Sequence, residues 1–279
     1  FTRGDGDFDA TLGANLATLS LSDMDVNAAD IAVTFGTART DVALEFSALT
    51  GGTGDDVTIT AAAINTLTLT PSSTSTIGTL TLGDAETVNV VANAKMTFVD
   101  GITTTDAAAT LTITGTGAVD LSAIDTGFTT VNAAGNSGGL TGEIGVGNSM
   151  VVTGSSSNDV ITANTTDALA TTDKLAVDAG GGTADVLVVA ETIDINSAAD
   201  GARYTNFEIV RTADSLNMAN IAVDAIQITG GTSESYTGMT AAQGANVTFL
   251  GDNTTATTFA LATATGTSDA ITINLSSAT

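Results

Sequence analysis

Short runs of alternating apolar and polar residues recur along this 279-residue chain. Leu, Ile and Val occupy one set of alternate positions in these runs, and Thr or Asn mostly occupies the other. Because successive side chains of a β-strand point to opposite faces, a period of two predicts half-buried strands. Such runs begin at Val57, Thr66, Thr79, Thr87, Thr110, Ala225 and Ala270.

Clusters of Gly, Asn, Ser and Asp separate the runs and predict turns, as at residues 51–56, 154–159 and 180–185. Residues with helical periodicity are scarce, and the best short candidates lie at 167–175 and 197–201. The runs follow one another at roughly 8 to 25 residues, without one repeat length. The pattern therefore predicts an all-β fold, either a parallel β-solenoid or small β-sandwich units, joined by Gly/Asp-rich turns.

Glycine-rich turns also supply the candidate domain boundaries, since a single Pro gives no linker signal. They divide the chain into an N-terminal β segment (residues 1–50), a β-rich, solenoid-like domain (51–153) and a second β-rich domain (154–279). Only 4% of the residues are aromatic, and most of the apolar ones are Ala, Val, Ile and Leu. Small and β-branched side chains of this kind suit closely stacked strands.

The charge balance excludes one class of partner and points to another. The chain has 31 Asp and Glu against six Lys and Arg, a formal net charge of −25. Phosphate recognition needs clustered basic residues, so nucleic-acid binding is excluded, and an anionic membrane surface is disfavoured. The chain has no Cys and no His, which removes the usual ligands of zinc, copper, haem and iron–sulfur clusters. Calcium and magnesium, the hard cations that bind through oxygen, remain, and of these Ca²⁺ is the expected cofactor in view of the turns described next.

Three turns approach the calcium-binding repeat G-G-x-G-x-D-x-U-x. Their glycines allow the backbone to turn with its carbonyls inward, and an Asp carboxylate then completes an oxygen cage. The alternative for each turn is an ordinary tight turn rich in Gly, Asn and Asp. The candidate ligands in the three turns are Asp55, Asp56, Asn158, Asp159 and Asp185.

A fourth candidate lies near the N-terminus, where Asp5, Asp7 and Asp9 are spaced two residues apart. This D-x-D-x-D spacing opens many calcium loops, but the bidentate Glu expected later in the loop is missing. A solvated acidic turn is the favoured interpretation of this segment.

Enzymatic signatures are sparse. Without His or Cys, neither a Ser-His-Asp nor a Cys-His arrangement is possible, so only carboxylate pairs or Lys could act as catalysts. Sugar-cleaving sites usually add aromatic platforms, and the chain has no Trp and two Tyr. The sequence therefore predicts a protein that is not an enzyme. No run of 18 or more apolar residues occurs, so no membrane span is predicted.

Several phrases of the sequence resemble those of the calcium-dependent surface-layer proteins of Gram-negative bacteria, of the Caulobacter type. These proteins carry RTX-type turns like the three above and are exported by type I secretion. The phrases are Ala85-Glu-Thr-Val-Asn-Val90, Asn206-Phe-Glu-Ile-Val210, residues 111–117 and residues 266–275. The resemblance implies a partly solenoidal subunit that polymerises into a lattice, with calcium stiffening subunits and bridging neighbours.

We therefore expect a structural subunit of a secreted, self-assembling bacterial cell-surface layer or filament, stabilised by calcium and located on the extracellular surface. The expected partners are other copies of the chain, with cell-surface polysaccharide as a second candidate. Two alternatives stay open: an adhesin or biofilm-matrix protein, and a β-helix polysaccharide-active enzyme.

Overall fold

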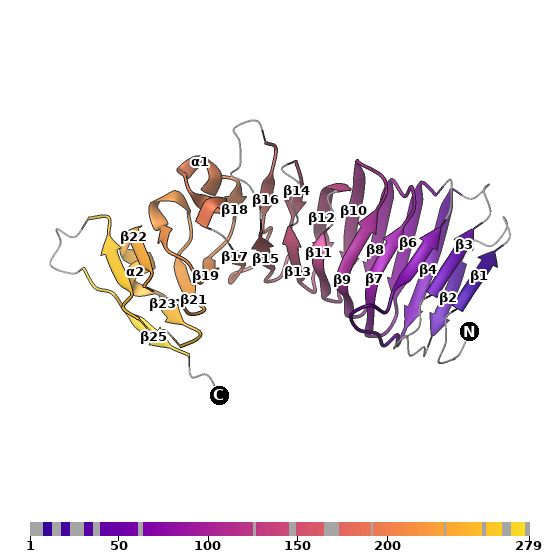
Figure 1. The fold of residues 1–279 in the computed structure, drawn as a ribbon, viewed down its shortest axis with the longest axis horizontal. Helices are drawn as coiled ribbons and strands as arrows, with labels where there is room; N and C mark the ends of the chain where they lie inside the picture. The colour runs from indigo at the N-terminus through magenta and orange to yellow at the C-terminus, as the bar shows by residue number, and fades with distance from the viewer. Residues whose placement is uncertain are drawn as a thin grey trace.

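The chain coils into a rod of parallel β-strands (Figure 1). The structure is a computed structural model, and the residues it describes are 8–12, 18–22, 31–35, 40–60, 64–124, 127–144, 149–164, 173–190, 192–231, 233–252, 255–263 and 269–276. Successive strands alternate between two sheets, so each turn of the coil, here called a rung, contributes one strand to each sheet. The first and last described strands, β1 and β25, lie toward opposite ends of the rod.

Sheet A runs the whole length of the rod and has 13 strands in the described part of the chain. Their order in the sheet is their order in the sequence. They are β1 (Phe8–Leu12), β3 (Ile31–Phe35), β5 (Val57–Thr60), β7 (Ser75–Leu82), β9 (Met96–Thr104), β11 (Val119–Ile124), β13 (Leu140–Ile144), β15 (Val160–Ala163), β17 (Val186–Val189), β19 (Ile209–Thr212), β21 (Ala225–Ile228), β23 (Val247–Phe249) and β25 (Ile273–Leu275).

Two further sheets lie along the rod. Sheet B has nine described strands: β2 (Thr18–Ser22), β4 (Asp41–Ser47), β6 (Thr66–Pro71), β8 (Thr87–Ala92), β10 (Ala109–Gly115), β12 (Phe128–Asn136), β14 (Val151–Thr153), β16 (Ala176–Asp178) and β18 (Tyr204–Thr205). Sheet C then takes its place with β20 (Leu216–Asn217), β22 (Ser235–Met239) and β24 (Thr258–Leu261).

Four short helical segments lie where sheet B gives way to sheet C and near the C-terminal end. They are η1 (Thr192–Ile195), α1 (Ala198–Gly201), η2 (Met218–Asn220) and α2 (Ala241–Ala245). Ser197 caps α1 by accepting a hydrogen bond from the backbone N–H of Asp200. Thr240 and Gln243 form a reciprocal capping box that starts α2. No helix in the described ranges is long and apolar enough to cross a membrane.

The core consists of aliphatic side chains stacked from rung to rung. The burial pattern of β6, with every second residue buried, shows that the alternating runs turn their apolar residues inward. In the parallel register, inward residues of one strand lie directly above those of the next, about 4.8 Å away. One such buried row in sheet B is Leu67, Val88, Leu111, Val131, Val152, Val177 and Tyr204.

These observations confirm the predicted all-β fold and select the parallel β-solenoid. A sandwich is built from antiparallel sheets, whereas every strand pair in the described part of the chain is parallel. The short α1 lies at one of the predicted helical segments, while most of residues 167–175 falls outside the described residues. The predicted domain boundaries at 50/51 and 153/154 stay predictions, and sheet A continues across both of them.

The register explains why no repeat length is visible in the sequence. Paired residues of neighbouring rungs are 16 positions apart at Ile209 and Ala225, but 27 apart at Val177 and Tyr204. The strands keep their register while the connecting turns change length. The rungs therefore repeat in space, but not at a constant number of residues.

The stacked core predicts a clear difference between inward and outward substitutions on one strand. Leu111 in β10 is fully buried, and its neighbour Thr112 points outward. Leu111→Ala should lower the free energy of unfolding by about 2–5 kcal/mol, because a cavity replaces packed methyl groups. Thr112→Ala should change it by less than about 0.5 kcal/mol. Urea denaturation of the two variants measures the difference, and equal losses would contradict the assigned faces.

Candidate functional site

The candidate ligands at the N-terminus cannot be placed. Asp5 and Asp7 lie outside the described residues. Asp9 belongs to β1, but its side chain is outside the described part of the chain. The predicted D-x-D-x-D site therefore stays a prediction.

In the first of the three turns, Asp55 and Asp56 accept hydrogen bonds from backbone N–H groups. The carboxylate of Asp55 is buried and accepts from the N–H of Gly52 in its own turn. Asp56 Oδ1 accepts from the N–H of Thr79 in the next rung at 2.9 Å. A further carboxylate reaches the same turn, because Asp100 Oδ2 accepts from the N–H of Gly54 at 3.0 Å. Asp56 and Asp100 thus connect the turn to other rungs, whereas the bond of Asp55 closes the turn on itself.

The second turn contains a fully enclosed carboxylate. Asp159 is fully buried, and its Oδ1 accepts from the N–H of Leu140 at 2.5 Å and from Ser155 Oγ at 2.7 Å. Its Oδ2 accepts from the N–H of Ser155 at 2.6 Å. The adjacent Asn158 Oδ1 accepts from the N–H groups of Thr183 and Ala184 in the following rung, at 3.0 and 3.2 Å.

The third turn continues this arrangement into the next rung. Asp185 Oδ1 accepts from the N–H of Asp159 at 2.7 Å, and the N–H of Asp185 donates to Glu208 Oε2 at 2.8 Å. Asp159, Asp185 and Glu208 each immediately precede a strand of sheet A. We call these three residues the carboxylate ladder, since each one accepts the backbone N–H of the equivalent residue in the rung before it.

The glycines of the pattern make room for these carboxylates. A Cβ on Gly182 would lie 2.6 and 2.7 Å from the two carboxylate oxygens of Asp185. A Cβ on Gly154 would lie 2.5 Å from Asp159 Oδ2 and 2.1 Å from the carbonyl oxygen of Ala179. Both glycines are therefore required by the close approach of an acid and the neighbouring backbone, whether or not a cation is bound.

Burial changes the acidity of Asp159 and Asp185. Desolvation raises the pKa of Asp159 above its ordinary value, although hydrogen bonds from Ser155 and Leu140 oppose the rise. Desolvation also raises the pKa of Asp185 to about 6, and the negative charges of Asp159 and Glu208 add to the rise. Asp185 Oδ2 is buried and accepts from no donor among the described residues, and a hydrogen bond between the side chains of Asp185 and Glu208 favours the protonated form. Of the two acids, Asp185 therefore has the clearest reason to bind a proton in mildly acidic solution.

This geometry does not present a ready calcium cage. Calcium takes six to eight converging oxygens, and the described residues contain no group of three or more acidic side chains placed to hold a metal ion. In each of Asp56, Asn158, Asp159 and Asp185, the Oδ1 atom already accepts a hydrogen bond from a backbone N–H group. A role for these residues as calcium ligands therefore stays a prediction, and hydrogen bonding between rungs is the role that their contacts support.

Glu208 is the member of the ladder that the sequence patterns did not identify. It occurs in the phrase 206–210, which was matched to a family strand and not to a turn. An available signal was its place directly before an apolar run, which it shares with Asp159 and Asp185.

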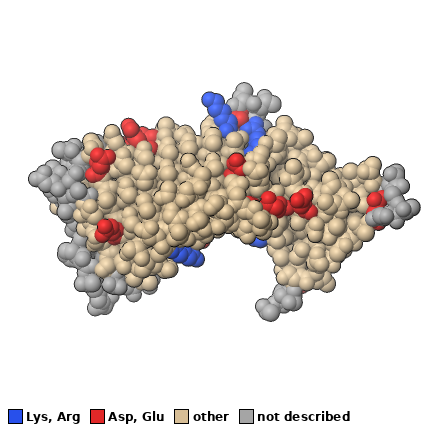
Figure 2. Space-filling model, turned by 180° about the vertical axis from the view of Figure 1, so that it is seen from behind, with Lys and Arg blue, Asp and Glu red and all other residues tan. Residues whose placement is uncertain are grey.

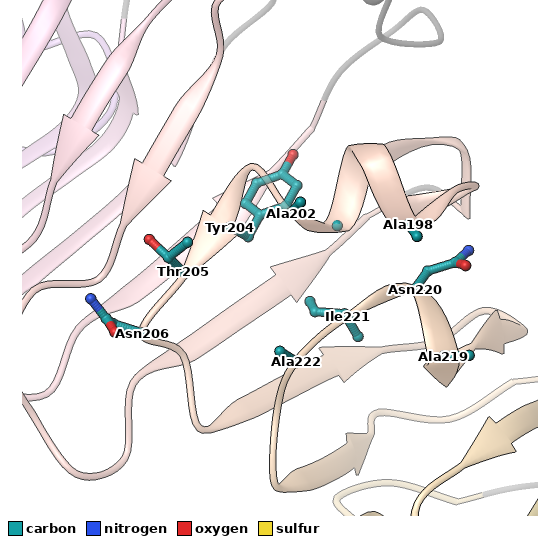
Figure 3. Close-up of a pocket in the computed structure, with 10 residues that line it drawn as sticks. Ala198, Ala202, Tyr204, Thr205, Asn206, Ala219, Asn220, Ile221 and Ala222 are labelled. Atoms are coloured by element: carbon teal, nitrogen blue, oxygen red, sulfur yellow. The ribbon is translucent and has the colours of Figure 1, made fainter. Parts of the chain in front are cut away.

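A cavity of about 550 Å³ lies where sheet B ends, between α1, β18 and η2 (Figure 3). Its only titratable lining residue is Tyr204, whose phenol oxygen is buried and without a described hydrogen-bond partner. Burial and the nearby charge of Asp194 raise the pKa of Tyr204 well above its ordinary value, so the ring stays neutral. The lining residues are Ala198, Gly201, Ala202, Tyr204, Thr205, Asn206, Ala219, Asn220, Ile221 and Ala222.

Comparison with protein-family models, with curated proteins and with solved structures gives no match for this chain. The parallel β-solenoid is therefore the class of protein that the structure itself defines. The likeness to surface-layer proteins stays an expectation from the sequence.

The carboxylate ladder predicts how one substitution changes the dependence of stability on pH. The pKa of Asp185 is raised on folding, so its contribution to stability is greatest below about pH 4 and is lost as the pH rises through 6. Asp185→Asn removes the buried charge while its carbonyl oxygen still accepts from Asp159. Because solvent screens part of the charge, the variant should gain on the order of 1–2 kcal/mol at pH 7.5 relative to wild type, and little at pH 4.

Urea denaturation at both pH values measures this difference. The control is Asp84→Asn, which removes one charge from an exposed residue and should show no comparable gain at pH 7.5. Equal pH dependence of Asp185→Asn and wild type would contradict the assignment.

A second substitution separates a structural role of Asp159 from a calcium role. Asp159→Ala leaves the buried N–H groups of Leu140 and Ser155 without their acceptor, so it should cost about 2–4 kcal/mol. If the carboxylate serves as an acceptor, the loss is the same in calcium and in EGTA. A loss that appears only in calcium would show that Asp159 acts as a metal ligand.

Proposed function

We propose that this chain is a structural subunit of a secreted, self-assembling bacterial cell-surface layer or filament. The observation that carries the proposal is the unbroken sheet A, whose parallel strands run from β1 to β25. A continuous ladder of backbone hydrogen bonds makes a stiff rod, and stacking at a fixed interval gives the rod a periodic surface. Stiffness and periodicity are the properties that a lattice or filament subunit needs.

The charge of the chain supports a calcium contribution between subunits. A net charge of −25 makes copies repel one another, and divalent cations relieve this repulsion. Acidic side chains form separate groups on the face shown in Figure 2, with wide uncharged areas between them. Because the turn carboxylates already accept hydrogen bonds, we place the main effect of calcium at exposed carboxylates, where it reduces repulsion between neighbouring chains.

The two alternative functions differ in what they require of this rod. An adhesin or biofilm-matrix protein would use the same stiffness to extend a binding tip, without regular assembly of the purified protein. A polysaccharide-active enzyme would need a groove lined by a carboxylate pair, and the cavity beside Tyr204 has none in its lining. A lattice or filament subunit, by contrast, makes use of the continuous parallel sheet A, which runs through the whole described rod.

Assembly and stability should respond differently to calcium. The purified chain should form sheets or filaments in calcium, seen by electron microscopy, and should disperse in EGTA. The melting temperature of dispersed chains should remain within a few degrees in both conditions, because the carboxylate ladder fastens the turns without an ion. Magnesium at equal ionic strength serves as the control for simple screening.

Two outcomes would contradict this account. If the chain does not assemble at any calcium concentration, the proposed function is wrong. If the melting temperature of single chains drops strongly in EGTA, calcium is bound within the turns and stabilises them.

A further inference from the structure

The outer face of sheet B between β6 and β14 carries no charge. None of these five strands contains an acidic or basic residue. Charged side chains border the area on β4 at Asp41 and Glu45, on β16 at Asp178, and directly before β8 at the exposed Glu86. In a chain with a net charge of −25, so wide an uncharged area is a distinct feature of the surface.

Outward side chains of this face form rows along the rod, although the pairing of β10 with β12 shifts register before Thr110 and after Thr112. Thr66, Thr87, Thr110 and Thr130 occupy equivalent positions in four consecutive rungs, so their side chains form one row with a spacing of about 4.8 Å. A parallel row two residues further along the strands alternates Thr with Asn, with Thr112 near its centre. Thr is branched at Cβ and has few rotamers, so covering these side chains costs little conformational entropy.

The opposite sheet does not share this character. The outward side of sheet A carries Asp100 on β9, Asp120 on β11 and Glu143 on β13, in the middle of the rod. Two copies that met through sheet A would bring these like charges together, which is unfavourable. Contact through sheet B would instead bring together strands that carry no acidic side chain.

An exposed apolar residue lies on the same face. Val151 in β14 is 43% exposed and continues the row of Thr110 and Thr130. The other large hydrophobic residues that are exposed in the described ranges lie at the C-terminal end of the chain, from Ile271 to Leu275. Covering Val151 would remove apolar area from water, which favours a docked partner at this face.

We propose that the outer face of sheet B, from β6 to β14, binds the same face of a second copy of this chain about a two-fold axis. The inference rests on the proposed function and names the surface through which it would act. A second copy is uncharged over the same area and repeats at the same strand spacing, so hydroxyl and methyl groups of the two faces match over several rungs.

The size of the face sets the strength of the contact. Five strands about 4.8 Å apart and about six residues long cover on the order of 500 Å² in plan. A standard stable interface buries about 800 Å² per partner. One contact of this kind is therefore weak, and an ordered assembly depends on many such contacts acting together.

A charge placed at the centre of the face tests the proposal. In Thr112→Glu, the two-fold axis brings the new carboxylate close to its counterpart in the second copy. The dissociation constant for self-association, measured by sedimentation equilibrium in calcium, should rise by at least about tenfold. The matched control is Thr81→Glu, which adds the same charge at an outward position of sheet A and should leave the association near that of wild type.

Circular dichroism and melting curves first establish that both variants fold. Wild-type chains that associate, with Thr112→Glu associating equally well, would overturn the inference and leave the proposed function intact. A stronger effect of Thr81→Glu would also overturn it, since sheet A would then be the contact. Wild-type chains that stay monomeric and bind a neutral polysaccharide through this face would overturn both proposals.

Discussion

Hydrogen bonding between parallel rungs is the interaction on which every other feature of this molecule depends. It fixes the spacing of the strands, and the spacing in turn requires small or branched aliphatic side chains that stack without gaps. The inward row from Leu67 to Tyr204 shows the result, because each residue closes the space above the one before it. It also gives the outer faces their regularity, since whatever points outward repeats at the same interval.

The turns must preserve that register where the ladder of the strands stops. Buried carboxylates do this by accepting backbone N–H groups of the next or preceding rung, as Asp159 and Asp185 do. A carboxylate has four acceptor positions and can serve more than one donor, which suits a corner where several N–H groups converge. The cost is a concentration of buried acidic groups at Asp159 and Asp185, and it is reflected in the raised pKa of Asp185. Acid-rich turns in this chain thus have a structural explanation that does not require an ion.

Sequence patterns predicted local structure well and spatial neighbours poorly. The run Thr66–Thr70 alternates strictly and forms most of β6, because burial of one face dictates both the pattern and the strand. The run beginning at Ala270 also alternates, but its strand starts only at Ile273 and its side chains are exposed. Alternation of apolar and polar residues predicts that a segment can form a strand. The strand buries its apolar face only where another part of the protein packs against that face. The helix α2 was missed although Thr240 and Gln243 have the spacing of a capping box.

The candidate site illustrates the same limit. The sequence identified Asp159 and Asp185 as important acids in glycine-rich turns, and both are buried at the corner of the rod. Their partners could not be predicted, because the rungs have no constant length and the residue above Asp159 is 26 positions away. Only the register reveals that an N–H group, supplied by the adjacent rung, meets each carboxylate.

The end of sheet B at β18 has a mechanical consequence. In a coil whose hydrogen bonds run along its axis, a pulling force passes through each junction between rungs in series, so the junction with the fewest bonds yields first. Beyond β18 the second sheet is interrupted until β20, and sheet A alone continues the ladder across the gap. This junction is therefore the weakest one under tension. In a molecule stretched from its two ends, the rungs would separate there before the strands from β4 to β14 lost their pairing.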